Sequence, residues 1–176
     1  MKKIILYSIT LTLLILNINY LSAQDNRGYI VQIGDQAPEF IIDGKNIIKE
    51  NKGKVIMLQF TASWCSVCIK EMPHIEEEIW QIHKDNDNFI LIGLAKDTEK
   101  RPQKNKEIDF MINKTGVTYP IISDDKSMAF NLFAEKKAGV TRNIIIDKNG
   151  KIQFLTRLFD REEFNQMKLK IENLLK

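Results

Sequence analysis

Hydrophobic and polar positions along this chain predict strands and helices in succession. Two mostly apolar runs of strand length, 55–61 and 89–95, are typical of central strands covered on both faces. Apolar residues at helical spacing follow each run, and they predict one helix over about 66–84 and a charged helix over about 98–114. Gly116 is placed to end the second helix.

The flanking segments complete a mixed α/β order. Residues 40–42 and 46–48 flank an Asp43-Gly44-Lys45 turn and predict an N-terminal β-hairpin at the sheet edge. Alternation followed by a hairpin and a last helix indicates a central mixed sheet with helices on both faces. The remaining expected elements are strand 119–122, helix 127–135 capped by Asp124 or Asp125, strand 139–147, strand 152–159 and a helix beginning at Asp160.

A Cys-x-x-Cys motif stands where the first long strand meets its helix. Cys65 and Cys68 are the only cysteines in the chain. A thiol at a helix start has a lowered pKa, because unpaired N–H groups and the helix dipole stabilise the thiolate. The second thiol lies one turn further on, close enough to close a small disulfide. The spacing therefore favours a dithiol that cycles through mixed disulfides.

Three other interpretations of the cysteines remain open. A purely structural disulfide would close too small a loop to contribute much stability. A zinc site needs about four ligands, and only His74 and His83, both on the same predicted helix, are left to supply them. Idle core thiols are the third alternative. We expect no metal and no cofactor.

The N-terminus is typical of a secretory signal peptide. Lys2 and Lys3 precede an apolar run over 4–18 that is short for a membrane span, and small residues end it near Ala23. We expect cleavage after Ala23 and export to the periplasm, with an uncleaved membrane anchor as the alternative. The predicted organisation is a signal peptide (1–23), a polar lead-in (24–32) and one domain (33–176).

The near-zero net charge of the mature chain argues against a nucleic-acid-binding surface. Without Lys2 and Lys3, 24 basic residues stand against 23 acidic ones, and no basic cluster is present. Outside the cytoplasm disulfides persist, so a lone Cys-x-x-Cys there either donates its disulfide or is kept reduced by a dedicated electron source.

These motifs together resemble the thioredoxin superfamily, and more narrowly the exported TlpA/ResA-like thiol-disulfide oxidoreductases. The resemblance covers roughly 33–176, and its most specific part is the Trp-Cys-x-x-Cys-x-x-Glu-Met-Pro string at 64–73. Weaker matches are Gly-Asp-x-Ala-Pro-x-Phe at 34–40, Gly-Lys-Val at 53–55 and Ile-Asp-Lys-Asn-Gly-Lys-Ile at 146–152.

The resemblance implies a thioredoxin-like fold and a set of roles. Cys65 would be the attacking thiol and Cys68 the resolving one, with Trp64 shielding the site. Glu71, one turn after Cys68, would move the proton of the buried partner; an ordinary solvated glutamate is the alternative. Pro73 lies inside the helix and is expected to kink it.

One departure concerns the cis-proline that the fold normally places opposite the cysteines. Gly139-Val140-Thr141-Arg142-Asn143 occupies that stretch, and Thr141 is the candidate for the vacant position. A cis bond without proline costs about 2.5–4 kcal/mol, so we expect a trans bond. The hydroxyl of Thr141 and the charge of Arg142 are expected to depress the pKa of Cys65.

The function that the resemblance implies is disulfide reduction in exported proteins. Its partners would be substrate protein disulfides and a membrane electron donor, and we expect a monomer. The first alternative is a peroxiredoxin-like (AhpC/TSA-type) peroxidase with Arg142 near Cys65, although Thr61 lies four residues before Cys65 rather than three and Met57 replaces the expected proline. The second alternative is a non-catalytic periplasmic binding module.

Overall fold

The central sheet is mixed, as predicted. The computed structural model describes residues 27–176, so the predicted signal peptide (1–23) and the start of the lead-in lie outside the described residues. Strands β3 and β4 run parallel, as do β4 and β5, whereas β6 is antiparallel to β3 and β7 is antiparallel to β6. The sheet order is β5 (Ile121–Asp124), β4 (Phe89–Lys96), β3 (Val55–Thr61), β6 (Arg142–Ile146) and β7 (Ile152–Leu155).

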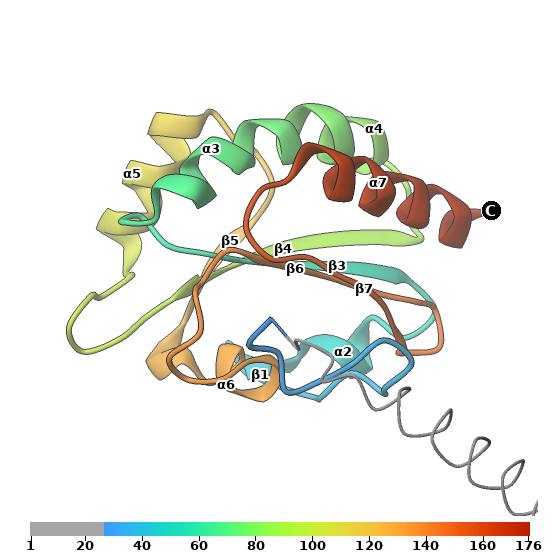
Figure 1. Ribbon diagram of the computed structural model, residues 1–176, viewed down its shortest axis with the longest axis horizontal. Coiled ribbons are helices and arrows are strands. Elements are labelled where there is room, and N and C mark those ends of the chain that lie inside the picture. The colour runs from blue at the N-terminus through green and yellow to red at the C-terminus, as the bar shows by residue number, and fades with distance from the viewer. Residues whose placement is uncertain (1–26) are drawn as a thin grey trace, which may run out of the picture.

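Helices cover both faces of this sheet, as the sequence pattern predicts (Figure 1). One face carries α3 (Ser66–Ile75), the π-helical turn η1 (Glu76–Trp80), α4 (Gln81–His83), α5 (Asn105–Thr115) and α7 (Arg161–Leu175). The other face carries β1 (Ile41–Ile42), β2 (Lys45–Asn46), α2 (Ile47–Glu50), the 3-10 turn η2 (Asp125–Ser127) and α6 (Phe130–Phe133).

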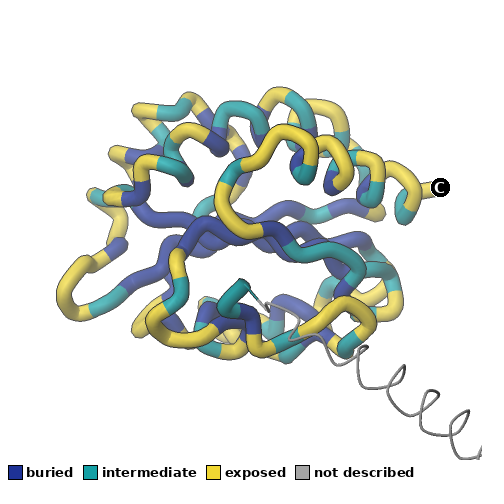
Figure 2. Tube along the Cα trace, in the orientation of Figure 1, coloured by how far each residue is buried: buried dark blue, intermediate teal, exposed yellow. Residues whose placement is uncertain are grey.

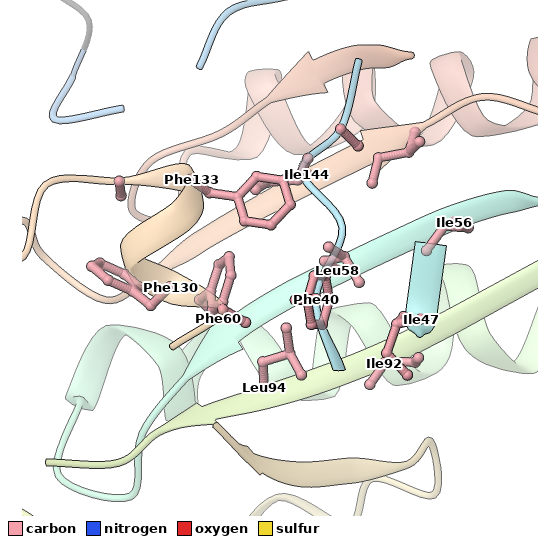
Figure 3. Packing of buried hydrophobic residues seen from close by; sticks show 14 of the residues in the cluster. Phe40, Ile47, Ile56, Leu58, Phe60, Ile92, Leu94, Phe130, Phe133 and Ile144 are labelled. Atoms are coloured by element: carbon pink, nitrogen blue, oxygen red, sulfur yellow. The ribbon is translucent and has the colours of Figure 1, made fainter. Parts of the chain in front are cut away.

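Two apolar clusters hold the layers on the sheet, which is buried between them (Figure 2). Every residue of β3 is buried, and successive side chains enter opposite clusters, as the period of a strand requires. The cluster under the sheet packs Phe60 edge-on against Phe130 at 5.3 Å between ring centroids (Figure 3). The cluster above it joins Met57 and Ile145 to Met72 and Phe164 of the covering helices.

Two expectations for the N-terminal half are wrong in detail. The 43–45 turn does form a hairpin, but β1 and β2 make a separate two-stranded sheet instead of an edge of the central one. Ile47 and Ile48 begin α2, because Asn46 caps that helix by accepting from Lys49 N at 3.0 Å.

The second long helix is shorter than predicted. It begins at Asn105 rather than near residue 98, and the intervening segment is a loop with a Thr98–Arg101 bridge. Pro102 accounts for the difference, because proline disfavours helical geometry in the residue before it and has no N–H for a helical hydrogen bond. Gly116 ends the helix with a φ of 71°, as expected.

Caps and turns in the C-terminal half explain further boundaries. The carboxylate of Asp124 accepts from the N–H groups of Ala129 and Phe130 at 2.8 and 2.9 Å, so it satisfies the first N–H groups of α6, although the N-cap position itself is Ala129. Asp160 accepts from Glu163 N at 2.9 Å and starts α7 as predicted. The strands predicted over 119–122, 139–147 and 152–159 are offset or shortened to β5, β6 and β7.

Pro73 lies inside the helix that follows the cysteines, and the helix continues past it. Regular α geometry is lost three residues later, in the π-helical turn Glu76–Trp80. The carboxylate of Glu76 is bonded there to the N–H and hydroxyl of Thr118, both at 2.7 Å. Within residues 27–176, no helix has both the length and the apolar character needed to cross a bilayer.

Candidate active site

The two cysteines lie where β3 passes into α3. Cys65 is the N-cap of the helix, and its Sγ accepts from the N–H of Cys68 at 3.2 Å. The pair is disulfide-bonded with 5.3 Å between the two Cα atoms, which is within the usual range. When the bond is reduced, the helix N-terminus offers its N–H groups and dipole to a thiolate on Cys65.

The two cysteines differ in how much residue surface they leave exposed. Cys65 retains 9% of its surface, whereas Cys68 is completely buried. Trp64 beside them is 43% exposed, and the guanidinium of Arg101 lies 4.5 Å from the centre of its ring. Of the two cysteines, only Cys65 therefore has surface open to a reaction partner, next to the exposed ring of Trp64.

Thr141 faces both sulfurs from the opposite segment. Its Oγ1 lies 3.2 Å from Sγ of Cys65 and 3.2 Å from Sγ of Cys68, and the residue is buried. Its carbonyl accepts from Leu158 N at 3.1 Å, which fixes the backbone behind the site. The described residues contain no cis peptide bond. A hydroxyl in this position can donate to one sulfur and accept from the other.

Glu71 is buried rather than solvated. It keeps 1% of its surface, on the side of α3 that faces the sheet, and its Oε1 accepts from Nδ2 of Asn143 at 2.8 Å. Burial raises the pKa of this carboxyl to about 7, against the lowering effect of hydrogen bonding from Asn143 and Gln59. A carboxyl with this pKa can exchange a proton near neutral pH.

Two neighbours of Glu71 were missed from the sequence. Gln59 and Asn143 are paired in register between β3 and β6, both are fully buried, and Gln59 accepts from the hydroxyl of Tyr119 at 2.7 Å. The available signal was a polar residue inside an otherwise apolar strand, which is costly unless it is hydrogen-bonded. Gln59 interrupts the run 55–61 in this way.

The structure directs Arg142 away from the cysteines. Its Nε donates to the carbonyl of Gly139 at 2.9 Å, another guanidinium nitrogen donates to the carbonyl of Arg27 at 2.7 Å, and the group stacks 4.3 Å from the ring centre of Tyr29. These partners hold the positive charge against the N-terminal segment. We therefore leave Arg142 out of the proposed chemistry, and the peroxidase alternative loses the arginine it relied on.

A second loop is tied to the active-site loop by a buried amide. Gln103 is 1% exposed, and its Oε1 accepts from Ser63 N at 2.7 Å. Its own N–H donates to the carboxylate of Asp97 at 2.7 Å. The segment 97–104, which we call the 97–104 loop, therefore braces the chain just before Trp64. The charged residues of this segment predict helix, whereas the helix begins only at Asn105.

The two histidines have aromatic partners. His74 stacks on Phe159 with ring centroids 5.0 Å apart, and His83 lies 5.4 Å from Phe89. In the described part of the chain, no three His, Cys, Asp or Glu side chains are grouped as a metal ion would require.

Comparison with known proteins places this geometry in a family. The model of the Redoxin family matches residues 32–174. The thiol-disulfide oxidoreductase ResA of Bacillus thuringiensis is 30% identical over 126 residues, or 69% of this chain and 68% of that protein. The ResA of Geobacillus thermodenitrificans is 25% identical over 141 residues, or 77% of this chain and 76% of that protein.

Solved structures agree in fold. A Bacteroides thetaiotaomicron protein described as a candidate protein disulfide isomerase is 47% identical, with a TM-score of 0.77, and the match covers 84% of this chain and 92% of that one. A Chlorobium tepidum protein described as a candidate thiol:disulfide interchange protein DsbE is 22% identical, with a TM-score of 0.68 over 83% of this chain and 99% of that one. The thioredoxin-like fold expected from the sequence is thereby confirmed.

Proposed function

Because this chain belongs to the redoxin family, as a TlpA/ResA-like thiol-disulfide oxidoreductase of the thioredoxin superfamily, we propose that it reduces the disulfides of exported proteins with Cys65 and Cys68. The observation that carries the proposal is the asymmetry of the pair. Cys65, at a helix N-cap, keeps a small exposed fraction of 9%, and it is bonded to a partner that is completely buried. One sulfur can therefore meet a substrate while the other resolves the product from behind.

Reduction then proceeds in two exchanges. The thiolate of Cys65 attacks a substrate disulfide, forming a mixed disulfide and releasing one substrate thiolate. Cys68 gives its proton to Glu71, and the resulting thiolate attacks Sγ of Cys65. The second substrate thiolate leaves, the Cys65–Cys68 disulfide forms, and two electrons have passed to the substrate. Glu71 then releases its proton toward solvent or the departing thiolate.

Each neighbouring residue has a proposed part in these steps. Thr141 hydrogen-bonds the sulfur that carries negative charge, since its Oγ1 is 3.2 Å from both. Trp64 covers the outer side of the pair, and Pro73 removes one N–H from the helix that holds Cys68 and Glu71. The chemistry uses no metal and no cofactor.

Location outside the cytoplasm is part of the same proposal. Residues 1–23 would act as a cleaved signal peptide, and the mature chain, with residues 33–176 as its domain, would work as a periplasmic monomer. Because an oxidising compartment does not regenerate dithiols, a membrane electron donor would reduce the Cys65–Cys68 disulfide after each turnover. Both named relatives that are ResA proteins are thiol-disulfide oxidoreductases, which supports this assignment of chemistry.

The test compares single-cysteine variants of the purified mature protein. Cys65→Ser is expected to abolish reduction of a model protein disulfide, whereas Cys68→Ser still forms a mixed disulfide through Cys65 but does not release it. Unchanged turnover by Cys65→Ser would overturn the assignment.

The direction of exchange is tested by the reduction potential of the Cys65–Cys68 pair. A reductase is expected near the thioredoxin value of about −270 mV, and a value near about −120 mV would indicate an oxidase instead.

A further inference from the structure

Three unpaired polar atoms lie on Glu71 and on the two amide side chains beside it. Within residues 27–176, Oε2 of Glu71, Nε2 of Gln59 and Oδ1 of Asn143 are buried and have no hydrogen-bond partner. Gln59 pairs in register with Asn143, which is the residue bonded to Glu71, and its amide also lowers the pKa of the Glu71 carboxyl. Buried polar atoms are rarely left unpaired, and three of them in one place require an explanation.

The three atoms can be hydrogen-bonded in two alternative arrangements, one for each protonation state of Glu71. An ionised carboxylate accepts hydrogen bonds at both oxygens, so Oε2 can accept from Nε2 of Gln59 while Oε1 keeps its bond to Asn143. A protonated carboxyl carries an O–H on Oε2, and that group needs an acceptor. The amide of Asn143 offers Oδ1 for this purpose, which would complete an acid–amide pair with two parallel hydrogen bonds.

We propose that Gln59 and Asn143 are positioning residues that clamp Glu71 in each of its protonation states, Gln59 bonding only the carboxylate and Asn143 completing a cyclic pair with the acid. The step that switches the clamp is a proton transfer from Cys68. The S–H bond breaks, its electron pair stays on sulfur, and an O–H bond forms at Oε2 of Glu71. Gln59 releases Oε2 as Asn143 Oδ1 accepts the new O–H.

Neighbouring side chains fix the orientation of both amides. The hydroxyl of Tyr119 donates to Oε1 of Gln59, which points Nε2 toward Glu71. Nδ2 of Asn143 also lies 3.0 Å from Oγ1 of Thr156, which holds the amide nitrogen on the carboxyl side. Neither amide can turn over without breaking a buried hydrogen bond, and each therefore presents one defined atom to the carboxyl.

The charged groups that face Glu71 do not provide this switching. Glu163 on α7 raises the pKa of Glu71 by its charge, but it is paired with Arg27, whose second guanidinium nitrogen lies 2.9 Å from it. Tyr119 approaches from the segment before β5 with its own pKa raised well above normal by burial, so it stays neutral. On α3 itself, Cys68 lies one helical turn before Glu71.

The experiment titrates Glu71 in the oxidised full-length mature protein by ¹³C NMR of its carboxyl carbon. The wild-type midpoint is expected at about 7. Gln59→Met removes a donor used only by the carboxylate, so the midpoint is expected to rise by about one unit. Thr61→Val, a neighbouring buried change on β3 whose hydroxyl contacts only methionine sulfurs, is the matched control and should leave the midpoint unchanged.

Infrared spectroscopy tests the other half of the clamp. The carbonyl stretch of protonated Glu71 is expected to move to higher wavenumber in Asn143→Leu, because the acid–amide pair is lost, and to stay in place in Gln59→Met. An unchanged midpoint in Gln59→Met, or an unchanged stretch in a folded Asn143→Leu, would overturn the proposal. Should Asn143→Leu not fold, the Gln59→Met midpoint decides alone.

The role of the clamp in exchange rests on the proposed function, but its test does not. Both readouts use the disulfide form, in which neither cysteine titrates and no turnover is needed. The NMR and infrared results can therefore contradict the clamp while reductase activity is intact. They can also support the clamp in a protein that has no reductase activity.

Discussion

Replacing Thr141 by Val should raise the pKa of Cys65 with little change in shape. Valine replaces the hydroxyl by a methyl group, so the contact at 3.2 Å from each sulfur loses its hydrogen bond. Because the hydroxyl has one proton, it can donate to a thiolate on Cys65 while accepting from the S–H of Cys68. The variant removes both bonds from the reduced state.

The magnitude follows from the cost of a hydrogen bond to a charged group. Such a bond contributes about 1.5–3 kcal/mol, and one pKa unit corresponds to about 1.4 kcal/mol, so the pKa of Cys65 should rise by about one to two units. At pH values between the two pKa values, the wild-type thiol is largely ionised and that of the variant is not, so alkylation of the variant should be slower by about tenfold or more. Because the thiolate exists only in the reduced form, losing the bond destabilises the dithiol and makes the potential about 30–60 mV more negative.

Two measurements check this reasoning. The rate of Cys65 alkylation is followed against pH in a Cys68→Ala background, and the potential is measured against a glutathione buffer with both cysteines present. Thr141→Ser, which keeps the hydroxyl, should restore most of the wild-type values, and Thr61→Val should not move them. Superimposable pH profiles for wild type and Thr141→Val would refute the role of the hydroxyl.

The other predictions concern Glu71 and Gln103. The raised pKa of Glu71 means that the unfolded chain releases this proton first, so stability from this group is fully present below about 4.5 and declines as pH rises to about 7. Between pH 4.5 and 7 the oxidised wild type should lose about 3 kcal/mol of unfolding free energy relative to Glu71→Gln, as measured by urea denaturation. Equal pH dependence of stability in the two proteins would contradict a buried carboxyl with a raised pKa. Gln103→Leu leaves the N–H of Ser63 without its partner and should cost about 1–3 kcal/mol while slowing exchange, and an unchanged rate would show that the brace does not position Trp64.

Much of the fold could be predicted from the sequence because its signals are local. The apolar run 55–61 and the Asp160 cap each act within a few residues, and both elements form as expected. The helix predicted over 98–114 failed at its start, where charged residues at helical spacing concealed the effect of Pro102. The hairpin at 40–48 was recognised from its turn, but its pairing partner in space could not be.

The candidate site divides in the same way. The cysteine motif is a local pattern, and its helix N-cap geometry follows from position alone. The contacts of Thr141 depend on how β6 aligns with α3 across the sheet, and the partners of Glu71 come from two strands far apart in sequence. Arg142 shows the limit most clearly, because neighbouring strand residues face opposite sides of a sheet and the choice of side is decided by register.

The 97–104 loop has a buried part that anchors the active-site segment and a separate exposed tip. Its buried end, through Gln103 and Asp97, holds the chain before Trp64 in place, while Glu99 and Lys100 at its tip are exposed. Changes at Glu99 and Lys100 can therefore alter the charge and shape of the surface near the cysteines while the hydrogen bonds of Gln103 remain. The tip can thus vary, in evolution or by engineering, around a fixed attachment to the segment that carries the cysteines.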